Sequence, residues 1–485
     1  MALSQESGVI GKASCGALAE APVFFILLSV CTSAALHDWL PGWAAVAAGT
    51  LVASASLLLC TRTSVIRWKI FFGTVVLFSM LFSGLSCLRL SADVSFPDSF
   101  SFTGRVLSRR PWGKSTALLL STPYGRAYAT LPSDKAPREG AEIYARVSSF
   151  ALKSAAKGFD EKKFWRAKGA ARRLVVFELR ELSPPSGTAA WRGSLEKLYS
   201  ERLLPLSHAY ISALTTGRRD TALFLLHKKA GTSHLLAISG FHLGILAALL
   251  LFLFRNTALQ LPVVSCFIWL YTALAGFPPG CVRAALLVQL CLLSRLAGRP
   301  SCAFNSVSTA LLLMLLWNPW YFFDVGFRFS ALAALFISAA SPFLGGGFSG
   351  AVFVSLLVWF VTAPLAASVF KEVPVAGLFL NIIAVPWFSL IFPMVLLLSV
   401  PALIGFSQTN SFSLAAEALL AFSEHCLAKA SELLPISAGY TYIFAALACG
   451  IFAAAVSLRC GCRLLFAPLI AVIFILFLSY CPGML

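Results

Sequence analysis

The sequence predicts a polytopic α-helical membrane protein of about 10–12 transmembrane segments, several of them broken, with a small exported β-barrel inserted in it. Of its 485 residues, 59% are hydrophobic and only 12% are charged. A soluble protein of this size could not bury so much apolar surface, so the composition excludes a soluble globular class. Apolar runs long enough to cross a bilayer recur along the chain, and one long polar stretch, 92–195, interrupts them.

The N-terminal region, 1–91, contains three predicted spans, at 22–40, 43–60 and 68–88. The loop between the second and third spans carries Arg62, Arg67 and Lys69. Because positively charged loops tend to stay in the cytoplasm, we expect this loop and the N-terminus on the cytoplasmic side. The polar stretch after the third span is then extracytoplasmic.

The polar stretch 92–195 is predicted to form a small β domain. It contains 18 basic and 9 acidic residues, a net charge of +9. Five short runs have strand-like composition, and turn residues separate most of them: 100–106, 115–122, 126–131, 141–148 and 173–180. Five strands in about a hundred residues fit a small barrel, and the OB-fold is the commonest five-stranded barrel.

The connection before the last of these strands mixes basic and aromatic side chains. The candidate residues for binding a single strand of nucleic acid such as DNA are Lys162, Lys163, Phe164, Trp165, Arg166 and Lys168. Lysine and arginine suit the phosphates of a strand, and aromatic rings suit its bases. A basic helix resting on anionic lipid head groups would have the same composition, and the sequence leaves both interpretations open.

The third region, 196–485, is predicted to be the channel domain. After an amphipathic segment at 195–230, its apolar runs lie near 234–253, 261–277, 280–298, 305–318, 322–340, 350–370, 374–403, 440–458 and 463–481. We expect breaks at Pro278-Pro279-Gly280, Pro386 and Pro393. Broken helices at membrane depth indicate a channel or transporter, because irregular backbone there must be buried in protein or line a cavity. Whether 374–384 and 411–436 span the membrane or are re-entrant or interfacial stays open.

The run 234–244 reads His-Leu-Leu-Ala-Ile-Ser-Gly-Phe-His-Leu-Gly and places ionisable groups at membrane depth, which indicates function. The candidate channel residues in this run are His234, Ser239, Gly240, His242 and Gly244. If the run is one helix, His234 and His242 share a face. The spacing of Gly240 and Gly244 would let another helix approach the backbone closely.

Two arginines stand near the starts of apolar runs. Arg283 follows the predicted break at 278–280, and Arg328 follows Asp324. Such a pair could bind a phosphate-bearing polymer or line an anion path. Each arginine could instead extend to the membrane interface, and Asp324 could simply cap the helix after it.

These motifs resemble those of the ComEC competence DNA-channel family. The run 234–244 is similar to the family signature, and 275–285 and then 324–330 follow it in the family's order. Asn381 and Pro386 resemble residues of a later intramembrane stretch, which adds both to the candidate channel residues, with Arg283. The segment 157–169 is similar to the one that closes the family's exported OB-like domain. Gln is usual in the family where Arg328 stands, so the resemblance implies no role for that arginine.

The resemblance implies a multi-pass channel in the cytoplasmic (inner) membrane that moves single-stranded DNA across it during natural transformation, and not an enzyme. Many family members carry a C-terminal metallo-β-lactamase-like domain, whereas this sequence ends after an apolar run, and none of its six histidines forms a His-x-His-x-Asp-His cluster. No cofactor or metal is therefore expected. Besides single-stranded DNA and the lipid bilayer, the implied partners are a DNA receptor, a nuclease in trans and a cytoplasmic ATPase or single-strand-binding protein, since the sequence has no P-loop.

Two other classes stay open. A secondary transporter or exporter of a small anionic substrate would bind that substrate independently of DNA. An intramembrane serine hydrolase would use Ser239 and His242 as a dyad, although their three-residue spacing puts both on one helix.

Overall fold

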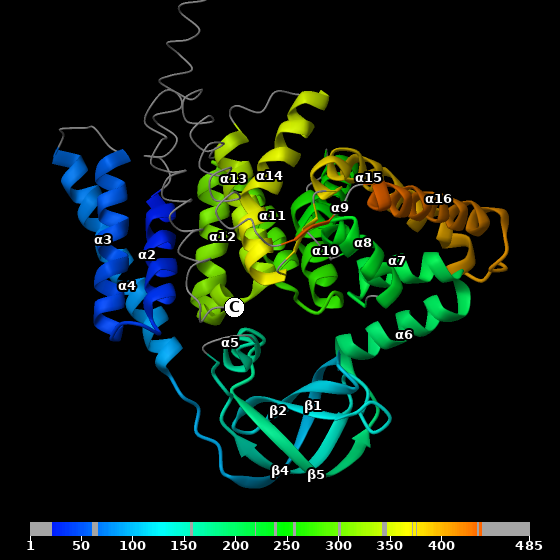
Figure 1. Cartoon of the computed structure of the whole chain (residues 1–485), viewed down its shortest axis with the longest axis horizontal. Helices are drawn as coiled ribbons and strands as arrows, with labels where there is room; N and C mark the ends of the chain where they lie inside the picture. Colours follow the sequence, from blue (N-terminus) through cyan, green and yellow to red (C-terminus); the bar gives the residue numbers. More distant parts are fainter. Residues whose placement is uncertain are drawn as a thin grey trace, which may run out of the picture.

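The computed structural model describes residues 22–60, 66–155, 159–218, 220–236, 240–255, 259–298, 302–341, 347–370, 372–374, 376–433 and 436–438. Within these ranges the protein is mostly helical, with one small closed barrel. The barrel lies at one end of the helices, with α2–α4 to one side of a central group and α6, α7 and α16 to the other (Figure 1). The predicted spans at 440–458 and 463–481 lie outside the described residues.

The first three helices confirm the three helical runs predicted in the N-terminal region. They are α2 (Pro22–Leu36), α3 (Gly42–Cys60) and α4 (Ile66–Ser91). Small residues let them pack closely: a Cβ at Gly49 would overlap the Ser33 Oγ, and the hydroxyls of Ser29 and Ser83 are 2.8 Å apart. Such contacts are typical of helices that associate in an apolar medium.

The barrel confirms the five predicted strands. They are β1 (Ser99–Trp112), β2 (Ser115–Thr122), β3 (Gly125–Pro132), β4 (Glu142–Phe150) and β5 (Arg172–Ser183). The closed order is β1-β2-β3-β5-β4, in which only β3 and β5 pair in parallel. β1 is longer than predicted because an irregularity between Val106 and Ser108 bends it from its pairing with β4 to its pairing with β2.

The short helix α5 (Glu161–Ala167) covers the outer face of β2 and β3. Asp160 starts the helix, because its Oδ1 accepts a hydrogen bond from the Lys163 backbone N–H at 2.8 Å. The Trp165 ring then stacks on the Tyr128 ring of β3, with centroids 4.0 Å apart and planes 7° apart. In an OB-fold, the strand 2–strand 3 face is the usual oligonucleotide surface. Here the chain's own helix occupies it.

The predicted amphipathic segment at 195–230 is three short helices, α6 (Gly187–Arg202), α7 (Pro205–Thr215) and α8 (Thr221–Lys229). A long-range contact holds α7 to α16 (Ser411–Leu433): the Glu417 carboxylate accepts hydrogen bonds from the backbone N–H groups of Leu206 at 2.8 Å and Ser207 at 2.9 Å. A carboxylate at the first turn satisfies N–H groups that have no partner within the helix.

Six helices form the central group. They are α9 (Gly240–Leu253), α10 (Gln260–Leu274), α11 (Pro279–Leu296), α12 (Ala303–Trp317), α13 (Val325–Ala340) and α14 (Gly347–Phe370), with short 3₁₀ turns η1 (Ser233–Leu235) and η2 (Pro319–Phe323). The predicted break at 278–280 is confirmed: Gly276 and Phe277 have positive φ, and α11 begins with Pro279 in its first turn. Since the helices alternate in direction, α9, α11 and α13 all begin at the barrel end (Figure 1).

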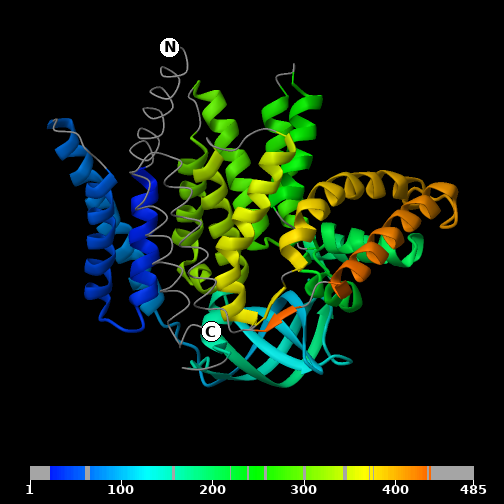
Figure 2. The same cartoon turned by 45° about the horizontal axis from the view of Figure 1, so that its top comes forward.

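The helix α15 (Ala376–Leu403) corrects one expectation. It runs without interruption through Pro386, Pro393 and Pro401, so the breaks expected at the first two prolines are absent. A proline removes one backbone hydrogen bond and bends a helix, and the α15 ribbon changes direction along its length (Figure 2). The pair β6 (Glu372–Pro374) and β7 (Ile436–Ala438) joins the segments that flank α15 and α16.

Three of the described helical segments are long and apolar enough to cross a membrane: Phe72–Ser91, Pro279–Leu296 and Ala376–Leu403. Seven shorter apolar helices accompany them in the described part of the chain. The larger number of spans expected from the sequence stays a prediction.

Candidate nucleic-acid interface

Three basic side chains on α5 or directly after it form ion pairs with aspartates near the ends of helices. The Lys163 Nζ lies 2.7 Å from Asp38, which follows α2, and an Nη of Arg166 lies 2.9 Å from Asp93, which follows α4. Lys168 pairs with Asp324, at the start of α13. We call this contact region, formed by α5, Lys168, Asp38, Asp93 and 318–324, the α5 seam.

Aromatic rings and an amide complete the α5 seam. The Lys162 Nζ and the Arg166 guanidinium each lie 5.8 Å from the Trp320 ring centroid, and the Lys163 Nζ lies 5.1 Å from that of Phe323. The Asn318 side-chain amide donates to the Arg166 carbonyl at 3.3 Å. Positive charge over an aromatic face is favourable, so η2 is suited to hold α5.

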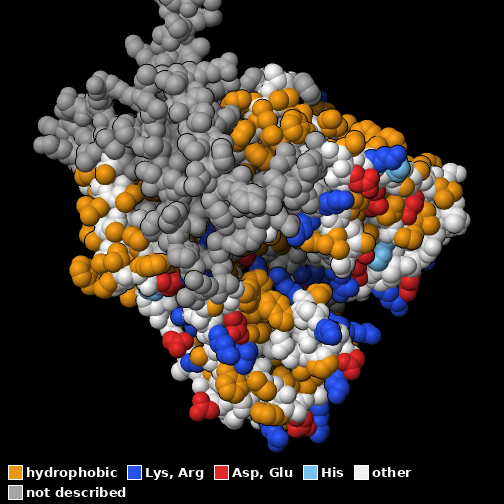
Figure 3. Space-filling model, in the orientation of Figure 1, with side chains coloured by type: hydrophobic (Ala, Val, Ile, Leu, Met, Phe, Trp, Pro, Cys, Tyr) orange, Lys and Arg blue, Asp and Glu red, His pale blue; other side chains and the backbone are white. Residues whose placement is uncertain are grey.

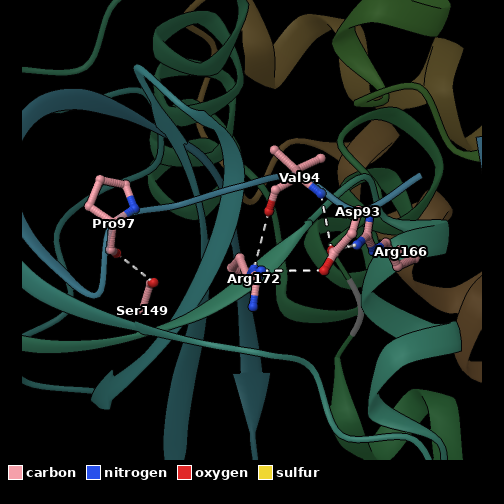
Figure 4. A network of polar contacts seen from close by, with 6 residues as sticks. All are labelled: Asp93, Val94, Pro97, Ser149, Arg166 and Arg172. Carbon is pink, nitrogen blue, oxygen red and sulfur yellow. Dashed lines mark hydrogen bonds and ion pairs between the residues drawn. The ribbon is translucent and has the colours of Figure 1, made fainter. Parts of the chain in front are cut away.

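Asp93 also anchors the segment that leads from α4 into the barrel. Figure 4 shows its carboxylate between Arg166 and Arg172, with the Arg172 Nη2 at 3.4 Å. The Arg172 Nε donates to the Val94 carbonyl at 3.3 Å. Ser149 of β4 donates to the Pro97 carbonyl at 2.7 Å, so the segment is fixed at both of its ends (Figure 4).

The structure therefore places most of the predicted DNA-binding residues against the protein itself. Lys163 is 9% exposed and Trp165 is 1% exposed, while Lys162, Phe164, Arg166 and Lys168 are partly buried. DNA binding by this set stays a prediction. The sequence did contain the complementary signal, since Asp38, Asp93 and Asp324 each stand at the end of an apolar run.

The two motif histidines do not lie on one helix, contrary to expectation. His234 belongs to η1 and is exposed, whereas His242 lies in the first turn of α9 and is 7% exposed. The His242 ring lies 5.2 Å from the Phe392 ring of α15. Ser239 lies outside the described residues, so the hydrolase interpretation stays open.

Gly240 and Arg283 are brought together. A Cβ at Gly240 would lie 3.1 Å from the Arg283 Nη2 and 3.1 Å from the Ala284 Cβ. The Arg283 Nη1 donates to the Ser330 carbonyl of α13. The glycine thus allows close approach of α9 and α11, and the arginine links three helices near their first turns. Gly244 differs, since the described chain places nothing within 4 Å of a Cβ there.

The remaining candidates lie on α15. Asn381 is partly buried, and its Oδ1 has no hydrogen-bond partner in the described ranges; Pro386 is exposed. The helix begins beside η1, because a Cβ at Gly377 would lie 3.2 Å from the Gly231 Cα. The start of α15 and the beginning of the 234–244 run are therefore neighbours.

Arg328 is enclosed and does not extend to an interface. It is 4% exposed, and its Nε donates to the Phe322 carbonyl at 2.7 Å. Asp324 caps α13 as expected, since its Oδ1 accepts from the Phe327 backbone N–H at 2.9 Å. Among the residues that the structure covers, no group of three His, Cys, Asp or Glu side chains could hold a metal ion.

Comparison with known proteins adds the family. The family model described as Competence protein matches residues 216–477, more than half of the chain. The chain belongs to this competence protein family. It is also 30% identical over 197 residues to ComE operon protein 3 of Bacillus subtilis (strain 168). That match covers 39% of this chain and 25% of the relative. No solved structure matches the chain significantly.

The competence family match has a clear boundary within the fold. It includes α9 with Gly240 and His242, α11 with Arg283, and α15 with Asn381. The barrel and the α5 seam residues on α5 precede it. The family match therefore assigns no role to the barrel, and its contacts and charge are the only indications of what it binds.

Proposed function

We propose that this chain is a channel that moves single-stranded DNA across the cytoplasmic membrane during natural transformation. Membership of the competence family and the similarity to ComE operon protein 3 support a role in DNA uptake. One structural observation carries the proposal further. The barrel belongs to a region of net charge +9 and lies at the end of the central group where α9 and α11 begin (Figure 1). A DNA strand bound to the barrel would therefore lie near Gly240 and Arg283, which are close to the starts of these two helices.

The distribution of tryptophan and arginine supports a membrane orientation with the barrel on the extracytoplasmic side. Trp39, Trp43 and Trp317 are 60%, 77% and 82% exposed, and all three lie at the barrel ends of helices. Tryptophan is enriched at membrane–water interfaces. Arg255 and Arg295 are exposed at the opposite ends of α9 and α11, where the positive-inside tendency favours the cytoplasm.

Arg283 and His242 are the side chains that we propose to line the path. The Arg283 guanidinium stands at the first turns of α9 and α11, where the helix dipoles also favour negative charge. It is suited to grip a phosphate through two N–H groups, which a lysine could not do. A DNA receptor, a nuclease and a cytoplasmic ATPase or single-strand-binding protein would act in trans.

Uptake of labelled DNA by living cells tests the proposal. A strain that lacks this chain should accumulate no labelled DNA in the cytoplasm, and the restored chain should return it. Uptake that continues without the chain would refute the channel function. Accumulation of a small anionic solute that depends on the chain, with DNA uptake unchanged, would favour the exporter interpretation.

A further inference from the structure

A hollow separates part of the barrel from the helices. Figure 3 shows the surface recessed there, with lysine and arginine side chains gathered along the recess. The α5 seam is also basic, but its Lys163, Arg166 and Lys168 are paired with aspartates. The arginines Arg110, Arg192 and Arg218 have no role in the function proposed so far.

A group of arginines lies near two glutamates, Glu139 and Glu196, where the barrel meets α6 and the α10–α11 turn. Glu139, between β3 and β4, pairs with Arg192 of α6. Arg192 also lies against the turn, since a Cβ at Gly276 would overlap its Nη1. Burial raises the pKa of Glu139, while the charges of Arg192, Arg218 and Arg110 lower it in part.

Two of these arginines remain accessible. The Arg218 side chain is 59% exposed, with an Nη 4.0 Å from Glu196, and Arg110 is exposed near the end of β1. Arg110 pairs with Ala117 of β2, and Ala117 lies on the face that α5 covers, so Arg110 belongs to the side of the barrel that faces the helices.

Aromatic rings lie next to Arg110 on the same side of the barrel. Trp112 stands two residues after Arg110 on β1, which puts both on one face of the strand about 7 Å apart. The Phe159 ring, 56% exposed, lies 5.6 Å from the Trp112 ring, and the latter is only partly buried. Accessible rings next to accessible guanidinium groups combine stacking with charge.

We infer that Arg110, Trp112, Phe159 and Arg218 form a binding site for single-stranded nucleic acid, in which the guanidinium groups hold backbone phosphates and the rings stack on bases. The inference rests on the proposed function and names where the strand lies between barrel and helices. An anionic membrane surface would satisfy the arginines, but it would offer the accessible rings of Trp112 and Phe159 no flat partner on which to stack. The observations therefore favour a strand over a lipid surface.

The test is binding of fluorescein-labelled (dT)20 to the purified full chain, measured by fluorescence anisotropy at several salt concentrations. The double variant R110Q/R218Q should weaken binding about tenfold and flatten the salt dependence by roughly 0.7 for each phosphate that the arginines no longer neutralise. Phe159→Ala should weaken binding severalfold at unchanged salt dependence. Arg146→Gln is the matched control, because Arg146 is exposed and belongs to β4, a strand that lies on the side of the barrel away from the helices (Figure 1).

Each outcome bears on the site. Binding by R110Q/R218Q equal to that of the unaltered chain, no binding by the unaltered chain, or a loss caused by Arg146→Gln would overturn it. So would variants that lose affinity for vesicles of phosphatidylglycerol but keep their affinity for (dT)20. Because binding and cellular uptake are measured separately, arginine-dependent binding without uptake would leave the site standing and refute the channel.

Discussion

The Asp324 carboxylate joins two parts of the protein through its two oxygens. Its Oδ1 caps α13, and its Oδ2 forms the ion pair with Lys168, 156 residues away in the sequence. One side chain thus starts a helix of the central group and holds the connection that closes the barrel. The α5 seam therefore couples the position of the barrel to the ends of the helices that carry the family motifs.

The ion pair of Lys163 with Asp38 should contribute to this coupling. Lys163→Glu should lower the free energy of unfolding by about 1–3 kcal/mol, because the lysine side chain is largely buried and its replacement opposes two acidic neighbours. Adding Asp38→Lys should restore part of the loss. Thermal unfolding of the purified chain measures both.

The matched control for this swap is the exposed pair of Arg180 and Glu178, whose side chains are 73% and 36% exposed. Reversing that pair should change stability by less than about 0.5 kcal/mol. If the two charge reversals change the free energy of unfolding by the same amount, the α5 seam does not hold the barrel in place.

Substitutions of Trp165 and Phe159 should have different effects, the first on the stability of the fold and the second on DNA binding. Trp165→Ala removes the ring stacked on Tyr128 and should cost about 3–5 kcal/mol of stability. Phe159→Ala removes an exposed ring and should leave thermal unfolding nearly unchanged while weakening (dT)20 binding. The opposite pattern in paired unfolding and anisotropy measurements would mean that Trp165 contacts the strand directly.

Gly240 and Gly244 offer a comparison on a single helix. Gly240→Ala should reduce DNA uptake severalfold, because its Cβ would press at 3.1 Å on both Arg283 and Ala284. Gly244→Ala should have little effect, since a Cβ there meets nothing within 4 Å in the described part of the chain. DNA uptake is measured together with membrane abundance for each variant. Equal uptake by the two variants would show that the close approach of α9 and α11 at Gly240 is not needed for transport.

DNA uptake should depend on the planar guanidinium group of Arg283 and not only on its positive charge. Arg283→Lys keeps the charge but loses the planar pair of donors, so uptake should fall about as far as in Arg283→Gln if phosphate is gripped bidentately. Abundance in the membrane serves as the control. Normal uptake by the lysine variant would reduce the role of Arg283 to that of a point charge.

His242 should matter for transport more than for folding. His242→Leu removes a polar group from the buried first turn of α9, so the variant should accumulate normally in the membrane and yet import no labelled DNA. Loss of the variant from the membrane would show that His242 is structural. Abundance together with full uptake would exclude it from the path.

Local patterns in the sequence determined most of the elements. The apolar runs predicted the helices, and the alternation between turn residues predicted all five strands, because a strand needs only a period of two and a helix only a continuous apolar stretch. The break before α11 was readable for the same reason, since it depends on neighbouring Gly and Pro residues. The sequence did not predict that α15 continues through its prolines, because whether a helix bends or breaks at a proline depends on the helices packed around it.

Only the tertiary structure decided which side chains are accessible. The basic cluster 162–168 has the composition of a nucleic-acid site, yet Asp38, Asp93 and Asp324, far away in the sequence, form ion pairs with its cations. Arg110 and Trp112 stand in no recognisable motif, because their nearness to Phe159 and to the charges around Glu139 arises from barrel closure and from the packing of α6. Composition specifies what a side chain can bind, but burial and charge pairing depend on contacts between residues distant in the chain, and these form only when the fold is complete.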